Sequence, residues 1–208
     1  MDHYKENSET WNKLAQLYQD KFMDLSIYND SYDYFCNSIG ISSARILDIG
    51  CGPGNISRYL LEQQPEYQLL GIDNAPNMVD LARKNIPNAS FQILDCRQIS
   101  SIQSTFDGII CGFCLPYLSH ADAPAFISDC YNLLNQNGIL YLSFVDGRAD
   151  QSEYKTGSTG DTTYFYYYST TELSSLLQSH HFAIVKILNV PFIKSDNSTE
   201  SHTIIFAH

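Results

Sequence analysis

The chain has 208 residues, of which 44% are hydrophobic and 17% are charged. This length and composition fit one globular domain with its own core, residues 1–208, and exclude a disordered polymer. The 12 basic and 23 acidic side chains give a net charge of −11, which repels nucleic acid and anionic membranes. We therefore expect neither of these as a partner.

The start of the chain and its cysteines indicate a compartment. There is no apolar run of about 18 residues, and the first residues are polar and of mixed charge, unlike a signal peptide. Six cysteines are explained better as reduced thiols than as disulfides, because a chain with its own core does not need such cross-links. These features predict a cytoplasmic protein.

The first 40 residues have a helical pattern. Trp11, Leu14, Ala15, Tyr18 and Phe22 recur at the spacing that places them on one face of an amphipathic helix. We expect residues 1–40 to form a helical segment that leads into the core.

Between residues 41 and 145, short apolar runs alternate with stretches of helical periodicity. The predicted strands are 44–50, 68–72, 90–94, 106–111 and 138–145, and the predicted helices are 55–64, 76–86 and 123–134. Asn137 and Gly138 are expected to close the last of these helices. Such alternation implies right-handed crossovers and a doubly wound, mainly parallel sheet with helices on both faces.

The end of the chain has a different pattern. Ser169 and Glu172 form a capping box before a helix. Residues 182–192 and 202–207 are rich in β-formers, which predicts an antiparallel hairpin at one sheet edge. Glycine is absent where the helix should stop, so either His181 adopts the left-handed conformation or the helix ends in another way.

The turn after the first strand is where a ligand is expected, because open α/β sheets bind ligands at the carboxyl ends of their strands. It reads Asp48-Ile-Gly50-Cys-Gly52-Pro-Gly-Asn55, and its glycines let the backbone approach a ligand closely. The dinucleotide fingerprint requires glycine where Asn55 stands. A carboxylate at Asp48 also suits an ammonium group better than a pyrophosphate.

Residues 46–55 resemble the first motif of class I S-adenosylmethionine-dependent methyltransferases, in which an acidic residue precedes a G-x-G-x-G turn. Residues 71–78, 94–97, 106–111 and 138–142 resemble the later motifs of the family in the same order. The resemblance implies a Rossmann-like seven-stranded sheet, with an N-terminal helical lid (1–40), a cofactor-binding core (41–145), and an acceptor segment with the C-terminal hairpin (146–208). It also implies methyl transfer from S-adenosylmethionine to a small molecule.

The resemblance further implies which residues bind the cofactor. They are Tyr18, Asp48, Gly50, Cys51, Gly52, Asn55, Asp73, Asn74, Met78, Asp95, Cys96 and Cys111. Asp73 is expected to accept hydrogen bonds from both ribose hydroxyls. Asn74 and Met78 would flank the adenine, and the backbone of Gly50, Gly52 and Cys111 would hold the methionine part.

Two of these roles have alternatives. Asp95 either meets the adenine amino group or caps a turn. Tyr18 either contacts the sulfonium through its ring or only packs in the core.

The implied reaction depends mainly on positioning and desolvation, because a sulfonium is already an excellent leaving group. Tyr117, His120 and Asp146 are candidates for an optional general base at the correct end of the sheet. The aromatic segment 146–168 either paves an acceptor pocket or forms a hairpin on the core.

Other functions are also considered. A nicotinamide-dependent oxidoreductase is disfavoured by Asn55 and Asp48, whereas a protein that binds S-adenosylmethionine without turnover stays open. Cys111 and Cys114 have the spacing of a redox pair but lack a thioredoxin pattern around them. The six histidines form no metal-binding array, so no metal is expected.

Overall fold

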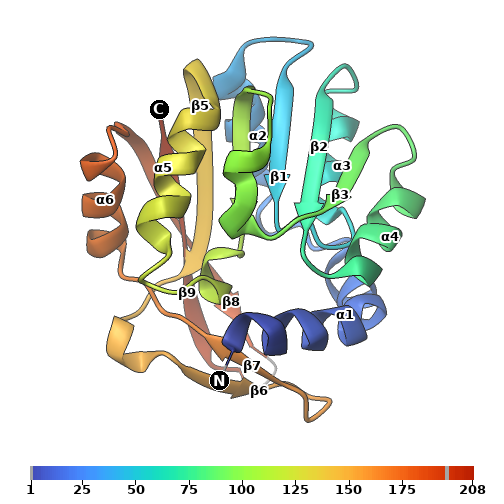
Figure 1. Cartoon of the computed structure of the whole chain (residues 1–208), viewed down its shortest axis with the longest axis vertical. Helices are drawn as coiled ribbons and strands as arrows, with labels where there is room; N and C mark the ends of the chain where they lie inside the picture. The colour runs from blue at the N-terminus through green and yellow to red at the C-terminus, as the bar shows by residue number, and fades with distance from the viewer. Residues whose placement is uncertain (1, 195–196) are drawn as a thin grey trace.

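The computed structural model describes residues 2–194 and 197–208, and within them a seven-stranded sheet lies between two layers of helices (Figure 1). Its strands are β1 (Arg45–Ile49), β2 (Gln68–Asp73), β3 (Ser90–Ile93), β4 (Phe106–Gly112), β5 (Leu134–Val145), β8 (Ile184–Ile193) and β9 (Thr199–Ala207). Their order is β3-β2-β1-β4-β5-β9-β8, with β1 to β5 parallel and β9 antiparallel to both of its neighbours. The predicted doubly wound sheet with an antiparallel C-terminal hairpin is confirmed.

The helices cover both faces of this sheet. They are α1 (His3–Phe22), α2 (Asn29–Ile39), α3 (Asn55–Gln63), α4 (Pro76–Asn85), α5 (Ala123–Leu133) and α6 (Thr170–Ser179), with 3₁₀ turns at Cys96–Ser101, Leu115–Tyr117 and Ala149–Gln151. The buried side chains of α2, α3 and α4 form one core layer, and those of α5 and α6 form the other. Alternation along each strand supplies both layers: Leu140 and Leu142 of β5 face α5, whereas Tyr141 between them faces the α2 side.

The strands and helices predicted between residues 41 and 145 are present, but the start of β5 differs from the prediction. α5 ends at Leu133, and β5 begins at Leu134, so Asn137 and Gly138 lie inside the strand and do not close the helix. The pairing of β4 with β5 shifts register between Phe106 and Gly108, and Asn137 takes a positive φ of 65° there. An irregular strand explains the turn-like pair of residues.

The end of α6 follows one of the two predicted alternatives. Ser169 caps the helix by accepting a hydrogen bond from the Glu172 backbone N–H at 3.2 Å. After the helix, His181 adopts the left-handed conformation with a φ of 71°. The segment predicted to connect β8 and β9 includes residues 195 and 196, which lie outside the described residues.

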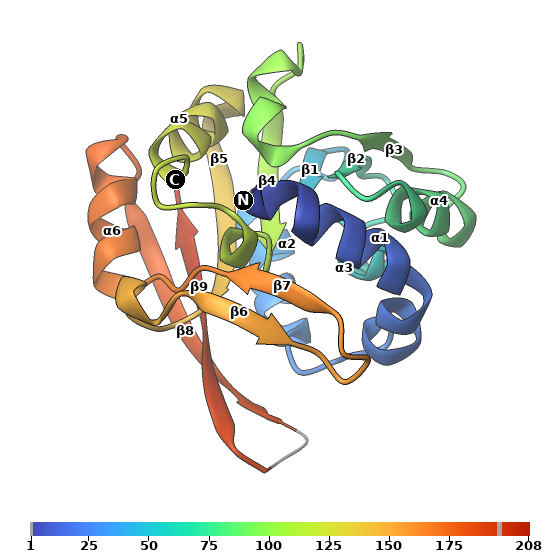
Figure 2. The ribbon, with the colours of Figure 1, turned by 60° about the horizontal axis from the view of Figure 1, so that its bottom comes forward.

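The aromatic segment forms a separate two-stranded ribbon of β6 (Glu153–Thr156) and β7 (Thr162–Phe165). Figure 2 shows β7 running beside α1, and the two are joined by side-chain to backbone hydrogen bonds. Asn7 both donates to the Tyr164 carbonyl and accepts from the Tyr164 N–H. The segment is therefore a hairpin, as one alternative predicted, but it packs on the N-terminal helix.

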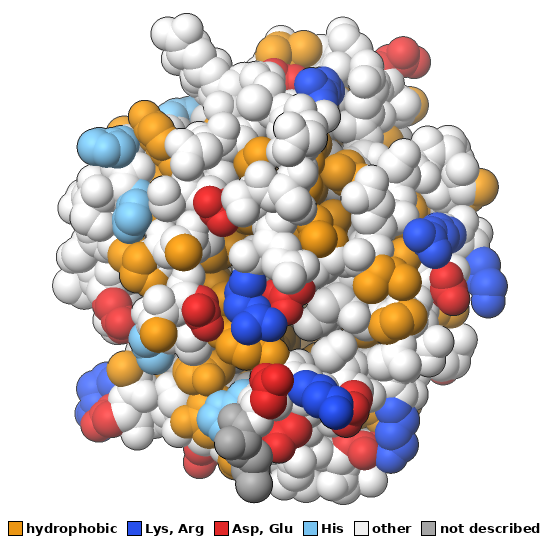
Figure 3. Space-filling model, viewed as in Figure 1, with side chains coloured by type: hydrophobic (Ala, Val, Ile, Leu, Met, Phe, Trp, Pro, Cys, Tyr) orange, Lys and Arg blue, Asp and Glu red, His pale blue; other side chains and the backbone are white. Residues whose placement is uncertain are grey.

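One face of the molecule carries its charges in mixed groups (Figure 3). On the face shown in Figure 3, acidic side chains lie beside Lys and Arg and do not form one acidic patch. No helix among the described residues combines the length and the apolar character that crossing a membrane requires.

Candidate active site

A cleft opens at the carboxyl ends of β1, β2 and β4 and is covered by α1, at the point where the strand order reverses. Its volume is about 860 Å³ including the solvent space at its open mouth. The predicted residues that line it are Tyr18, Gly50, Gly52, Asp73, Asn74, Met78, Asp95, Cys96 and Tyr117.

The glycine turn and the end of β2 are joined by hydrogen bonds. Asp73 accepts from the Gly52 N–H at 3.0 Å through one carboxylate oxygen and from the Ala75 N–H at 2.9 Å through the other. Gly50 has a φ of 70°, and a Cβ there would lie 2.9 Å from the Cβ of Cys114. A side chain at this position would therefore be strained and crowded. The turn and the carboxylate form one rigid wall of the cleft.

Asp48 is fully buried behind this turn and does not line the cleft. Its Oδ2 accepts from the Ser57 hydroxyl at 2.6 Å, whereas its Oδ1 has no hydrogen-bond partner. Burial raises the pKa of this carboxyl to about 7, against the opposing effect of the Ser57 hydrogen bond. The site thus holds an incompletely compensated acidic group directly beneath the glycine turn.

Three more predicted residues lie outside the cleft wall. Cys51 and Cys111 are buried in opposite core layers, one on each face of the sheet. Asn55 begins α3 and lines a smaller neighbouring pocket. A backbone contact with a ligand remains the role predicted for Cys111.

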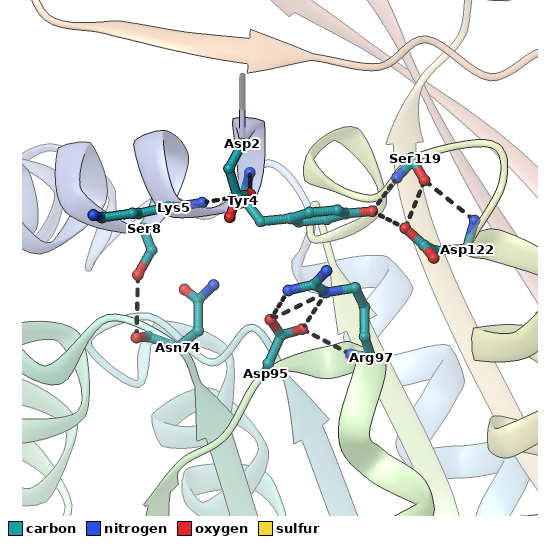
Figure 4. A network of polar contacts seen from close by, with 9 residues as sticks. All are labelled: Asp2, Tyr4, Lys5, Ser8, Asn74, Asp95, Arg97, Ser119 and Asp122. Atoms are coloured by element: carbon teal, nitrogen blue, oxygen red, sulfur yellow. Dashed lines mark hydrogen bonds and ion pairs between the residues drawn. The ribbon is translucent and has the colours of Figure 1, made fainter.

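Asp95 follows β3 in the cleft wall and takes the capping role that was one of its alternatives. Its Oδ1 accepts from the Arg97 backbone N–H at 2.9 Å, and its Oδ2 accepts from Arg97 Nη2 at 2.6 Å. The hydrogen bonds and charge of Arg97 lower the pKa of Asp95 although burial opposes them. Figure 4 shows this pair facing the first turn of α1.

Tyr4 joins the first turn of α1 to the part of the cleft that contains Asp95 and Arg97 (Figure 4). The Arg97 guanidinium lies 3.6 Å from the centre of the Tyr4 ring. The Tyr4 hydroxyl donates to Asp122 and accepts from the Ser119 N–H at 2.9 Å. These contacts connect the N-terminal helix to the loop before α5.

Aromatic rings close the middle of the cleft. Trp11 meets Tyr18 and Tyr117 edge to face, with ring centres 5.6 Å apart in both pairs. The ring of Tyr18 reaches the glycine turn, because a Cβ on Gly52 would lie 3.6 Å from it. Burial, with the charge of Asp73, raises the pKa of Tyr18 to about 12. Both alternatives for Tyr18 are compatible with this position.

The remaining candidate bases lie away from the cleft. His120 Nδ1 lies 3.1 Å from Glu172 Oε1, beside α6. Asp146 accepts from the backbone N–H of Thr170 at 2.9 Å at the start of α6. Of the three predicted bases, Tyr117 alone lines the cleft, and burial raises its pKa above the ordinary value.

Sequence reasoning missed other lining residues, namely Tyr4, Asn7, Ser8, Trp11, Leu94, Gly112, Phe113 and Cys114. The first four follow helical spacing and extend the predicted stripe of α1 toward the N-terminus, so this signal was available. Phe113 carried no such signal, since its positive φ of 55° is a tertiary feature. Within the described parts of the chain, no three His, Cys, Asp or Glu side chains are grouped as metal ligands.

Comparison with known proteins agrees with this site. Residues 46–138 match the model of a methyltransferase domain family. The chain is 28% identical to a putative methyltransferase of Invertebrate iridescent virus 6 over 133 residues, covering 64% of this chain and 47% of that protein. It is 34% identical to a trans-aconitate 2-methyltransferase of Enterobacter sp. (strain 638) over 101 residues, covering 49% and 39%. The matches thus span less than half the length of these relatives.

Solved structures with a similar fold also include methyltransferases. An S-adenosylmethionine-dependent methyltransferase from Clostridium acetobutylicum ATCC 824 superimposes with a TM-score of 0.74 at 14% identity, covering 95% of this chain and 98% of that one. The matched core contains the glycine turn and Asp73, and the strand order places both at the cleft. Residues 46–138 thus match a methyltransferase domain, and the chain has the fold of S-adenosylmethionine-dependent methyltransferases.

Proposed function

We propose that this protein transfers a methyl group from S-adenosylmethionine to a small molecule. The observation that carries the proposal is the charge of the cleft wall. Asp73 lies on the glycine turn with Asp48 buried beneath it, and no Lys or Arg among the described residues lines the cleft. Such a wall favours a cationic ligand over the pyrophosphate of a dinucleotide.

The unpartnered oxygen of Asp48 indicates what kind of ligand the site suits. A buried carboxylate oxygen without a partner is costly, and a positive charge above the turn would stabilise the ionised form. A cofactor with an ammonium and a sulfonium group supplies that charge. The residues present therefore fit S-adenosylmethionine.

The proposed roles follow the length of the cleft. Asp73 would accept the ribose hydroxyls with the lone pairs that the backbone leaves free. Asn74 and Met78 lie beside it in the cleft wall, where Met78 offers an apolar surface to the adenine, and Asp95 lies at the same end. Tyr18 would cover the methionine end above Gly50.

When bound, S-adenosylmethionine supplies an electrophilic methyl group on a positively charged sulfur. The chain contributes orientation and the exclusion of water, because α1 covers the cleft and Trp11, Tyr18 and Tyr117 pack over it. Of the three predicted bases, Tyr117 is the one in the cleft wall, whereas His120 and Asp146 have structural partners elsewhere.

We also propose that residues 1–208 act as one methyltransferase domain in the cytoplasm. Contacts of α1 with the loop before α5 and with β7 support the single domain. The six cysteines are free thiols, which supports a reducing compartment.

Titration calorimetry with S-adenosylhomocysteine tests the cofactor. We expect binding, and we expect Asp73→Ala to weaken it at least about 100-fold, because two charge-assisted hydrogen bonds are lost. Asp80→Ala is the matched control, since Asp80 is exposed on α4 and pairs with Arg83 at 3.2 Å. Absence of binding at millimolar ligand, or tighter binding of NADH, would contradict the proposal.

Turnover separates an enzyme from a protein that only binds the cofactor. Radiolabelled S-adenosylmethionine should transfer label to an acceptor from a panel of small phenols, amines, thiols and carboxylates. Intact binding with no transfer to any of them would favour the non-catalytic alternative.

A further inference from the structure

A second, aromatic pocket adjoins the cofactor cleft. It is a small space of about 400 Å³ when the solvent at its open side is included, and its walls include Phe22, Tyr28 and Tyr32 from the N-terminal segment. Tyr18, Gly50, Gly112 and Phe113 line both spaces, so the two meet across these residues. We call this space the aromatic pocket.

The direction of the cleft places the aromatic pocket next to the reacting atoms. Asp73 and Met78 stand at one end of the cleft, where the ribose and adenine are proposed to lie. The methionine part must then run along the glycine turn toward Gly50 and Gly112. A molecule in the aromatic pocket would face the cleft at that boundary, which is where a methyl acceptor has to be.

Beside this pocket, a tyrosine and a histidine from opposite ends of the chain meet. The hydroxyl of Tyr28 lies 2.5 Å from Nδ1 of His202, and both residues are buried. β9 runs antiparallel to β5 and pairs His202 with Val145, which brings the histidine to the carboxyl end of the parallel strands. The antiparallel strand therefore delivers His202 to the functional edge of the sheet.

The surroundings fix the ring and the protonation of His202. The rings of Phe113 and Phe192 lie on it, each with its centre 4.8 Å away. Its Nε2 lies 3.7 Å from Glu200 Oε2, and since a carboxylate only accepts, the Nε2 carries the proton and Nδ1 accepts from Tyr28. Burial lowers the pKa of His202, although Glu200 opposes this, so the ring is neutral and able to take up a proton.

Glu200 is itself held in the charged form. Lys155 Nζ and Lys194 Nζ lie 3.5 Å and 3.4 Å from its Oε1. These lysines lower the pKa of Glu200 although burial opposes them. An imidazolium at His202 would therefore face an ionised carboxylate. Tyr28, His202 and Glu200 form a connected chain, which we call the tyrosine–histidine chain.

The aromatic pocket also indicates the class of acceptor. Five of the ten described residues that line it are aromatic, and aromatic rings stack on planar molecules. No Lys or Arg among the described residues lines it or the cleft, so it has no cationic group to hold a carboxylate-rich acceptor such as an aconitate. A neutral aromatic molecule fits these walls, and a hydroxyl on it would give the tyrosine–histidine chain a proton to accept.

Resting on the proposed methyltransferase function, we propose that the aromatic pocket binds a neutral phenol and that Tyr28 and His202 take its proton. The phenol oxygen forms a bond to the methyl carbon while the carbon–sulfur bond breaks and its electron pair stays on sulfur. The phenol proton passes to the Tyr28 oxygen as the proton of Tyr28 moves to His202 Nδ1. Tyr28 is the catalytic residue, and His202 and Glu200 are positioning residues that act through it.

Two phenols of different acidity test this assignment. 4-Methylphenol has the acidity of a tyrosine side chain, with a pKa of about 10, so it must lose a proton during the reaction. 4-Nitrophenol is far more acidic and is largely ionised in the mildly alkaline buffer in which both rates are measured, so it does not need a base. We expect Tyr28→Phe and His202→Asn to lower kcat about 100-fold with 4-methylphenol and less than about 5-fold with 4-nitrophenol.

The two variants differ in what they keep. Tyr28→Phe retains the ring, whereas His202→Asn retains an acceptor that cannot take up the proton but loses the ring contacts with Phe113 and Phe192. Tyr34→Phe is the matched control, because Tyr34 lies on the same N-terminal segment but packs against Phe206, away from the pocket. It should change neither rate by more than about twofold. Calorimetry with S-adenosylhomocysteine on each variant verifies that the cleft is intact.

The outcomes separate this assignment from the proposed function. A selective loss with 4-methylphenol supports the tyrosine–histidine chain as the base. Equal losses with both phenols would show that the chain is structural and would overturn it. Intact binding of S-adenosylhomocysteine without transfer to either phenol would overturn the acceptor class, and failure of the wild type to bind S-adenosylhomocysteine would overturn the methyltransferase function itself.

Discussion

The cofactor cleft and the aromatic pocket share a boundary but are assembled in different ways. Gly52 and Asp73, which form the cleft wall, are 21 residues apart and belong to two successive strand-to-helix units. Tyr28 and His202, which meet beside the aromatic pocket, are 174 residues apart. The cleft can therefore be recognised in a short stretch of sequence, whereas the pocket exists only after the last strand has joined the sheet.

Their electrostatics differ as well. The cleft has a buried carboxyl group with an unpartnered oxygen beneath it, and a bound cation would favour its ionised form. The groups at the aromatic pocket are neutral or paired, since His202 is uncharged and the lysines neutralise Glu200. Binding of a charged cofactor is thus separated from the handling of a proton. The following predictions test this contrast, from the largest expected effect to the smallest.

Asp48→Asn should remove a pH dependence that originates in the cleft. The pKa of Asp48 in the folded protein is about 7, above its ordinary value of 3.8, because of burial. Its contribution to stability is present at low pH and is lost as the pH rises through 7. At pH 8 without cofactor, the variant should exceed the wild type in unfolding free energy by up to about 4 kcal/mol.

Chemical denaturation of both proteins at pH 5 and pH 8 measures this effect. The gap between the two unfolding free energies should shrink to about 2 kcal/mol at pH 5, because the effect develops between the unfolded pKa of 3.8 and the folded pKa of about 7. Asp80→Asn serves as the control, because the side chain of Asp80 is 59% exposed and should show no such difference. A gap between wild type and Asp48→Asn that stays constant with pH would show that Asp48 is not the titrating group.

Gly50→Ala should test how rigid the boundary of the two pockets is. The new Cβ would have to accept a φ of 70° and a contact of 2.9 Å with the Cβ of Cys114, which the backbone holds in place. We expect a loss of about 3 kcal/mol in unfolding free energy from strain and overpacking together.

Gly160→Ala gives the matched comparison. Gly160 also has a positive φ, of 82°, but a Cβ there would meet nothing within 4 Å. Its substitution should cost about 1 kcal/mol, from the backbone alone. Equal losses at the two glycines would contradict the tight contact between the glycine turn and Cys114.

Tyr4→Phe should loosen α1 over the cleft without affecting the tyrosine–histidine chain. The variant keeps the ring beneath Arg97 but loses the hydrogen bonds with Asp122 and Ser119. We expect the free energy needed to open the first turns of α1 to fall by about 1 kcal/mol. The affinity for S-adenosylhomocysteine should be about 5-fold lower.

Hydrogen exchange of residues 3–8 measures that opening. Tyr131→Phe is the control, because Tyr131 lies on α5 and is 41% exposed. Removal of its hydroxyl should leave the exchange unchanged. Unaltered exchange in Tyr4→Phe would mean that the other contacts of α1, such as those of Asn7 with β7, are enough to hold the helix in place.

Regular patterns made most of the sheet predictable. Strand, turn and helix follow one another between residues 44 and 134 with apolar periodicity and clear stop signals, so β1 to β4 and their helices match expectation. The start of β5 was mispredicted because Asn137 and Gly138 have the composition of a helix stop, whereas pairing with β4 extends the strand through them. The hydrogen bonds between β4 and β5 outweighed the local preference of these two residues for a turn.

The sequence by itself determined the sheet, the glycine turn and Asp73, since each depends on residues that are neighbours in the chain or in successive units. Tertiary structure decided which of the candidate bases reaches the cleft and how Asp95 is paired. It also brought His202 to Tyr28, because an antiparallel strand at the end of the chain reverses direction and returns to the carboxyl edge. Contacts of this kind depend on strand order and direction, which no local pattern of residues encodes.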